Sequence, residues 1–291
     1  MQFSLARQCF IREICQSDEQ ICLERAALYI AQEEDPTLDV EEYLNALDVM
    51  AEEVQARLPK ELYPLRIIQT INRYLYDDLG FSGNRSDYYD PRNSHLHQVI
   101  DRRLGIPITL SLVYLAIAKR IDFPMVGIGF PGHFLIRPVV EEMDLYIDAF
   151  NRGAVLFKED CAELLGQGDN PTFMIAANWF APVSNRQFLS RMLGNLKTNY
   201  INSGNSQRSL AAIERILLLF PDTPTELRDR GIIYYQMNRW VEARQDLERY
   251  LAAKPTTQDR GLILQLLASG LSILILCVSD LQNPYGIVDL E

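Results

Sequence analysis

His133 and Asp148 are the two residues of this sequence whose types and spacing best suit catalytic chemistry. A histidine that a carboxylate holds in one orientation can act as the general base for a nucleophile. Two hydroxyl groups, those of Thr109 and Ser111, lie upstream in an apolar stretch and are the candidate nucleophiles. Together these side chains are typical of a hydrolase or amidase that attacks a carbonyl with a hydroxyl group.

A helix and three strands must position these side chains. Pro107 suits the first turn of a helix, and the almost wholly apolar run 108–121 predicts a central helix covered on every side. Two β-rich segments, 125–130 and 133–137, flank a Pro-Gly turn dipeptide and predict a hairpin. Residues 145–147 form the next expected strand, directly before the aspartate.

This order of elements resembles the transglutaminase-like (papain-like) core. The resemblance implies a cysteine nucleophile at the helix N-terminus, a histidine base, and an aspartate that orients the histidine. The helix dipole and the protonated histidine would lower the pKa of such a thiol. His133 and Asp148 match the second and third positions, whereas Pro107, the last residue of Gly-Ile-Pro, stands where the cysteine is expected. Proline supplies no nucleophile.

Three stretches carry the likeness further: NSHLHQVIDRRLGIPITLSLVYLAIAKR, PGHFLIR and YIDAF. They are similar to the bacterial SirB-one type branch of that superfamily, named after an invasion-gene regulator, whose members often join the core to tetratricopeptide repeats. The resemblance covers most of the chain and implies a mostly helical α+β fold. It implies an N-terminal helical region, a core in which a central helix packs on a small antiparallel sheet, and C-terminal tetratricopeptide hairpins. It implies no particular activity.

Each candidate side chain also has a structural explanation. Thr109 is expected to cap the first turn of the central helix, and Ser111 to be a core hydroxyl bonded to the preceding turn. The sequence favours these roles over nucleophilic ones, because a fully buried hydroxyl cannot reach a substrate. His133 and Asp148 can likewise be a buried pair that joins two strands.

No metal or cofactor is predicted. His95 and His97, which with His133 and Asp148 would make up a ligand set, lie two residues apart and therefore do not share a helix face. Cys161 lies downstream of both His133 and Asp148, the reverse of the superfamily's order, and is expected to be a buried or incidental thiol.

The composition, 48% hydrophobic and 23% charged over 291 residues, is that of an ordinary globular protein. The net charge of −11 argues against nucleic acid as the partner, because phosphate binding needs concentrated Lys and Arg. The five cysteines form no CxxC pair, and the N-terminus shows no secretory cleavage pattern. A cytoplasmic protein is therefore expected.

The regions before and after the core differ in pattern. Apolar residues at helical spacing predict helices over 19–34, 39–58 and 65–79. The stretch 80–93 is rich in Gly, Ser, Asn and Asp and predicts a loop. Tyr88-Tyr89 in this loop are candidates to line a groove beside the central helix. The expected regions are 1–90, helical; 91–180, the transglutaminase-like core; 190–258, two tetratricopeptide repeats; and 259–291, an apolar helix and tail.

The repeats show a period of 34 residues, the spacing of Pro221 from Pro255 and of Tyr200 from Tyr234. Gly231 falls in the usual small position of the second copy. Two stacked helical hairpins bury a shared face and leave a concave surface, which commonly binds another chain. A protein or peptide partner is therefore expected at the repeat surface.

The segment 261–278 has no charged residue in 18 positions. A packed capping helix is the favoured interpretation, ahead of an oligomer or partner interface and of a membrane contact. The sequence leaves the oligomeric state open. Taken together, these patterns favour a degenerate transglutaminase-like domain that binds or regulates and is not an enzyme, with the hydroxyl-nucleophile hydrolase as the alternative.

Overall fold

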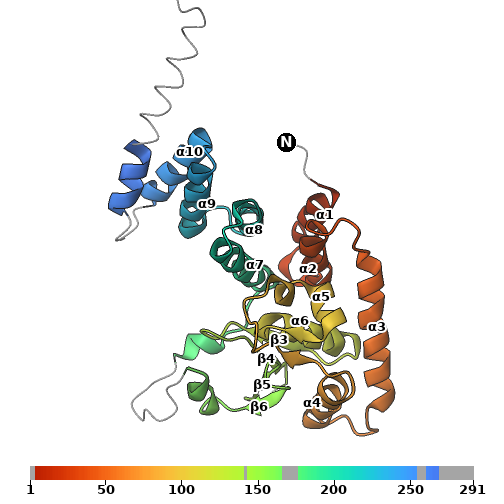
Figure 1. Ribbon diagram of the computed structural model, residues 1–291. Helices are drawn as coiled ribbons and strands as arrows, with labels where there is room; N and C mark the ends of the chain where they lie inside the picture. The colour runs from red at the N-terminus through yellow and green to blue at the C-terminus, as the bar shows by residue number, and fades with distance from the viewer. Residues whose placement is uncertain (1–3, 141–142, 166–175, 254–259, 269–291) are drawn as a thin grey trace, which may run out of the picture. The chain divides into compact units, whose positions relative to one another are not determined.

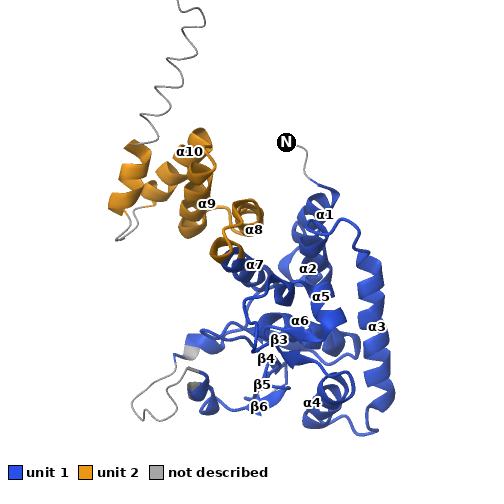
Figure 2. Ribbon diagram, viewed as in Figure 1, with its two compact units in different colours: residues 1–199 blue, residues 200–291 orange. Residues whose placement is uncertain are grey.

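The computed structural model describes residues 4–140, 143–165, 176–253 and 260–268 (Figure 1). The chain divides into two compact units, residues 1–199 and residues 200–291 (Figure 2). The predicted fold class is confirmed: the structure is mostly helical and contains a small antiparallel sheet.

The first unit begins with four helices, which end in an unusual turn. Asp39 caps the third, because its Oδ1 accepts hydrogen bonds from the N–H groups of Glu41 and Glu42 at 3.0 and 3.4 Å. Pro64 occupies the first turn of the fourth. The helices are α1 (Leu5–Ile14), α2 (Leu23–Gln32), α3 (Val40–Arg57) and α4 (Pro64–Asn72).

Helix α4 is shorter than the sequence predicts, because the chain continues as a π-helix, η2 (Arg73–Asp78). The N–H of Leu79 bonds the carbonyl of Tyr74 at 3.0 Å, the wider spacing of a π-helical turn. This segment buries three consecutive side chains, Tyr74, Leu75 and Tyr76, more than one face of a regular α-helix presents. The periodic apolar pattern could not reveal this change of pitch.

The predicted central helix is α6 (Pro107–Arg120), with 11 of its 14 residues buried. Helices α2, α3 and α5 (Leu96–Arg102) and strands β3 and β4 all contact it. The predicted loop 80–93 holds β1 (Ser82–Gly83), which pairs in parallel with β2 (Leu104–Gly105), and ends in a short 3-10 helix, η3 (Pro91–Ser94).

The antiparallel sheet follows α6 in the order β3-β4-β5-β6. The predicted hairpin forms, with Gly127 of β3 opposite Ile136 of β4, and Gly132 in its turn has a φ of 67° that suits glycine. The strands are β3 (Met125–Ile128), β4 (Leu135–Pro138), β5 (Tyr146–Asp148) and β6 (Ala154–Leu156).

The second unit contains stacked helical hairpins. Gly231 of α9 lies so close to α10 that an added Cβ would come within 2.7 Å of Leu247 Cγ, which explains the small residue at that position. Residues 260–268 are helical, and Ile263 is buried with Leu227 and Tyr250. The helices are α7 (Asn185–Asn202), which crosses the boundary between the units, α8 (Ser206–Leu219), α9 (Pro224–Gln236) and α10 (Trp240–Ala252).

The apolar C-terminal segment is described only in its first part. Ile263 packs in the interior of the second unit, in the way a capping helix would. Residues 269–278 of the predicted helix lie outside the described residues. Within the described residues, no helix combines the length and the apolar character needed to cross a membrane.

Candidate functional site

His133 and Asp148 lie side by side at one end of the sheet. His133 comes just before β4, Asp148 is the last residue of β5, and these strands are neighbours, so the fold brings the two side chains together. The distance from His133 Nε2 to Asp148 Oδ1 is 2.8 Å, an ion pair when the imidazole is protonated. The Nε2–H bond is not directed squarely at this oxygen. The Asp148 side chain is 1% exposed and that of His133 is 13% exposed.

Backbone and side-chain donors hold the Asp148 carboxylate. Its Oδ1 accepts hydrogen bonds from the N–H groups of Phe150 and Asn151 at 3.0 and 3.1 Å, and its Oδ2 accepts one from Asn151 Nδ2 at 2.6 Å. Burial alone would raise the pKa of Asp148, but His133 and the Asn151 donors outweigh burial and lower that pKa. Asp148 is therefore ionised, and its carboxylate stabilises both the turn after β5 and the nearby imidazole of His133.

Arg191, from α7, fixes the backbone of the histidine. Its Nη2 donates to the carbonyl of Phe130 at 2.8 Å and also to the carbonyl of His133. Burial lowers the pKa of Arg191. Because His133 N–H also donates to the Phe130 carbonyl at 3.1 Å, the turn before β4 is held from both sides.

Aromatic side chains cover the imidazole ring. Phe150 meets His133 edge to face, with ring centroids 6.1 Å apart, and Tyr88 meets Phe150 in the same way at 6.0 Å. The Phe150 ring lies against Gly83, where an added Cβ would come within 2.5 Å of it. The Arg85 guanidinium lies 5.2 Å from the Phe150 ring centroid. Residues of the predicted loop 80–93 therefore pack against Phe150, and Phe150 in turn covers the imidazole of His133.

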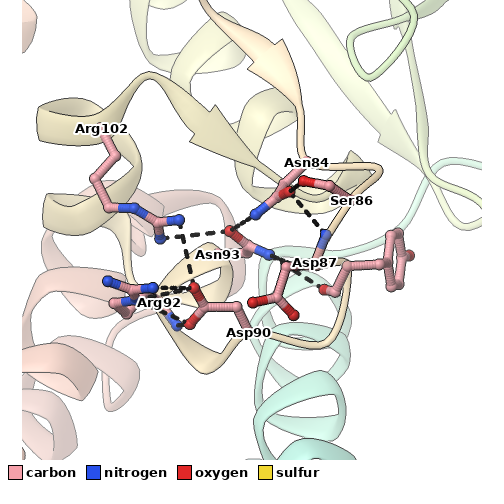
Figure 3. A network of polar contacts seen from close by, with 8 residues as sticks. Asn84, Ser86, Asp87, Asp90, Arg92, Asn93 and Arg102 are labelled. Atoms are coloured by element: carbon pink, nitrogen blue, oxygen red, sulfur yellow. Dashed lines mark hydrogen bonds and ion pairs between the residues drawn. The ribbon is translucent and has the colours of Figure 1, made fainter.

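A polar network centred on Asp90 holds this loop in place (Figure 3). Asp90, which is buried, pairs with Arg92 Nη2 at 2.8 Å and with Arg102 Nη2 at 3.4 Å. Asn84 Nδ2 donates to Asn93 Oδ1 at 3.1 Å, and Asn93 Nδ2 donates to the carbonyl of Asp87 at 2.7 Å. The loop is therefore tied to α5 by charge-assisted bonds.

The two candidate hydroxyl nucleophiles do not meet His133. Thr109 Oγ1 donates to the carbonyl of Asn93 at 2.7 Å and accepts from the N–H of Ile106 at 3.1 Å, as a helix cap does. Ser111 is fully buried, and its hydroxyl has no hydrogen-bond partner among the described residues. Within that part of the chain, no hydrogen bond or ion pair joins either hydroxyl to His133.

Within the described residues, neither Pro107 nor Cys161 can supply the expected thiol nucleophile. Pro107 begins α6 and is buried. Cys161 is fully buried, its thiol donates to the carbonyl of Phe157 at 3.3 Å, and burial together with nearby Asp160 raises its pKa to about 11. Such a thiol stays protonated at neutral pH and is a poor nucleophile.

Tyr76 is a neighbour of the site that the sequence did not suggest. It is buried in η2, and its hydroxyl has no hydrogen-bond partner among the described residues. Burial, and secondarily the charge of Asp148, raise the pKa of Tyr76 well above its usual value. Tyr76 is buried within the π-helical segment, and the sequence pattern did not predict that change of pitch.

His95 and His97 belong to a separate cluster near α3. His95 Nε2 lies 3.4 Å from Glu34 Oε2, and His97 meets the Tyr43 ring edge to face at 5.8 Å. Burial, and secondarily His95, lower the pKa of His97. In the described part of the chain, no group of three or more His, Cys, Asp and Glu residues could hold a metal ion.

Comparisons with known proteins agree with this architecture. The transglutaminase-like superfamily matches residues 41–194, and a tetratricopeptide repeat family matches residues 196–268. The first match covers more than half of the 291 residues. The chain belongs to the transglutaminase-like superfamily and carries C-terminal tetratricopeptide repeats.

Relatives are found in bacteria and in animals. A UPF0162 protein of Xylella fastidiosa is 39% identical over 250 residues, which are 84% of this chain and 89% of the relative. The UPF0162 protein YchA of Escherichia coli is 27% identical over 222 residues, 76% of this chain and 81% of its own. F-box only protein 21 of Homo sapiens is 34% identical over 188 residues, 61% of this chain but 29% of that protein. No solved structure matches the chain.

Proposed function

We propose that this chain is a non-catalytic transglutaminase-like domain whose tetratricopeptide repeats bind a protein or peptide, so that the whole acts as a binding or regulatory module. The observation that carries the proposal is that, within the described residues, neither candidate hydroxyl is hydrogen-bonded to His133 of the His–Asp pair. The family resemblance assigns Pro107, the first residue of α6, to the position of the superfamily's cysteine, and the hydroxyls of Thr109 and Ser111 are fully buried.

The repeat unit supports the binding half of this proposal. Tetratricopeptide repeats generally mediate protein–protein interaction. Exposed apolar side chains are what a partner's apolar residues can cover. In the described part of the second unit these are Ile201, Met237, Val241, Leu262 and Leu264.

The hydrolase remains the second candidate because of one observation. The His133 side chain is 13% exposed to solvent, and its Nε2 lies 2.8 Å from Asp148 Oδ1. An imidazole oriented in this way can act as a base through its other nitrogen. A hydroxyl that moved to it would restore the chemistry of a Ser–His–Asp hydrolase.

Covalent labelling distinguishes the two candidates. The purified protein and a His133→Ala variant are treated with a fluorophosphonate and with iodoacetamide, and the modified residues are mapped by mass spectrometry. We expect no fluorophosphonate adduct at Thr109 or Ser111 in either protein, and iodoacetamide adducts only at exposed thiols such as Cys15. An adduct at Thr109 or Ser111 that disappears in His133→Ala would overturn the non-catalytic assignment.

Peptide selection tests the binding half. A displayed peptide library is selected on the full chain, and the affinity of recovered peptides is measured by fluorescence polarisation. Val241→Asp places a charge on the repeat surface and should weaken binding about tenfold, the usual effect of losing an important interface contact. Val49→Asp, at an exposed valine of α3, is the matched control. Equal losses in both variants, or a loss only in the control, would contradict a repeat-surface site.

A further inference from the structure

A second polar site lies in the first unit, where the C-terminal end of α3 meets α4 and η2. It is a pocket of about 710 Å³. Three arginines line it, Arg57, Arg66 and Arg73, together with Gln69, Thr70 and one carboxylate, Asp78. Small-molecule sites occupy about 300–1,000 Å³, so the volume suits a compact organic ligand.

The lining residues of α4 form one face of the helix. Arg66, Gln69 and Thr70 of α4, and Arg73, its C-cap and the first residue of η2, follow the spacing i, i+3, i+4 and i+7, which places them above one another. Three of them are exposed and Thr70 is half-buried, whereas Ile67, Ile68 and Ile71 on the other face are buried. The apolar face fixes the helix, so the cationic face is presented by a rigid element.

The arginines differ in their partners. Arg57 is oriented by ion pairs with Asp78 and with Glu53, and its guanidinium lies 4.7 Å from the Tyr74 ring centroid. The side chains of Arg66 and Arg73 have no hydrogen bond or ion pair within the described residues. Two guanidinium groups therefore keep all their donors available at the same pocket.

The charge of the pocket opposes that of the chain. Its lining carries three arginines against one aspartate, whereas the whole chain has a net charge of −11. Concentrating unpaired cations costs electrostatic energy unless an anion is present. A guanidinium fork matches the oxygens of a phosphate group in a bidentate geometry, and the Gln69 amide between the two arginines offers a further donor.

We propose that this pocket binds a soluble small-molecule phosphate ester, with Arg66 and Arg73 holding the phosphate group and Arg57 at its side. Phosphate is favoured over a single carboxylate because two guanidinium forks match a dianion with three terminal oxygens. This inference is independent of the proposed function, since none of the lining residues belongs to the His133 site.

Isothermal titration calorimetry with phenyl phosphate tests the proposal on the full chain. Arg66→Gln and Arg73→Gln should each weaken binding at least about tenfold, the effect of losing one charge-assisted pair. Arg152→Gln, at an exposed arginine paired with Asp77 outside the pocket, makes the same change in net charge and should alter binding less than twofold. Equal losses in all three variants would overturn the proposal, because they would reflect net charge alone.

A second set of variants and ligands completes the test. Arg66→Lys and Arg73→Lys keep the charge and lose the fork, so they should also weaken binding, and they decide the question should either glutamine variant unfold. Sulfate that binds as tightly as phenyl phosphate would show nonspecific screening and overturn the proposal. A phosphoserine peptide that binds more tightly than phenyl phosphate would overturn the small-molecule assignment in favour of a phosphorylated protein. No detectable heat with any phosphate ligand would also overturn it.

Discussion

The two units of this chain are stabilised by polar contacts of very different range in the sequence. In the first unit, Asn72 donates to Gly153 across 81 residues, Arg120 pairs with Glu24 across 96, and Asn185 N–H donates to Asp18 across 167. In the second unit, the Arg230–Asp246 pair spans 16 residues and the Arg239–Glu242 pair spans three. These polar contacts therefore join distant segments of the first unit, whereas in the second unit they join helices that are adjacent in the sequence.

This difference explains why the candidate site lies where it does. His133 contacts Asp148 and Phe150 at the end of β5 and Arg191 of α7, and Phe150 in turn packs on Gly83, so three distant segments surround this histidine. Only a fold with long-range contacts can hold such a set. The repeats instead offer an extended surface whose stability is close to a sum of local terms, which suits binding better than chemistry.

Loss of the Asp148 carboxylate should have the largest effect. Asp148→Ala leaves the N–H groups of Phe150 and Asn151 without their acceptor and His133 without its partner, so the free energy of unfolding should fall by about 3–5 kcal/mol. The first unit should unfold at lower urea concentration, and hydrogen exchange should show protection of α9 and α10 unchanged.

His133→Ala is the control for this variant. It removes the same ion pair but leaves the carboxylate with its backbone donors and with Asn151, so its cost should be clearly smaller, about 1–2 kcal/mol. Equal costs for the two variants would mean that the pair itself, and not the anchoring of the turn, carries the stability. That result would weaken the contrast between the units.

A substitution at Gly231 should have a smaller and more local effect. Because an added Cβ would lie 2.7 Å from Leu247 Cγ, Gly231→Ala forces α9 and α10 apart and should cost about 1–3 kcal/mol. Gly194→Ala in α7 is the matched control: nothing lies within 4 Å of the added Cβ there, so the better helix propensity should stabilise by up to about 1 kcal/mol.

Hydrogen exchange locates the effect of Gly231→Ala. Faster exchange confined to α8, α9 and α10 is expected, with the strands β3 to β5 unaffected. If exchange instead rises equally in both units, the second unit is not the semi-independent array that its short-range contacts indicate.

Much of the fold could be predicted because it depends on local patterns. The apolar run after Pro107 predicted α6, the Pro-Gly dipeptide predicted the β3–β4 hairpin, and the 34-residue period predicted the packing of Gly231 in the second unit. Each of these features depends on residues that lie close together in the sequence. Residue propensity and sequence periodicity predict such local features well.

The surroundings of the site could not be predicted, because they depend on contacts between distant segments. Nothing in the sequence links Arg191 to the carbonyl of His133, 58 residues away, or seats Phe150 on Gly83. The inward turn of Tyr76 needs a π-helix that continues the apolar pattern of α4 without interruption. The proximity of His133 and Asp148 could be anticipated from the family resemblance and because both residues lie at or next to the ends of neighbouring strands.

The smallest expected effect is a difference between the two units in how much stability each loses at acidic pH. All three histidines, His95, His97 and His133, lie in the first unit. Burial lowers the pKa of His97, so below the ordinary value of 6.5 the unfolded chain takes up a proton that the folded chain resists. The first unit should therefore lose stability as the pH falls from 7 to 5, by at most about 1.4 kcal/mol per pH unit for one proton.

Urea unfolding of the protein and of His97→Gln at pH 7 and pH 5 measures this effect. Asp35, Glu34, Asp101 and His95 also act on His97, and Gln keeps a polar side chain beside them. The variant should lose less stability than the parent between the two pH values, and the repeat helices should unfold at the same urea concentration at both. A repeat unit that became equally acid-sensitive would contradict the division, because it has no histidine to titrate in this range.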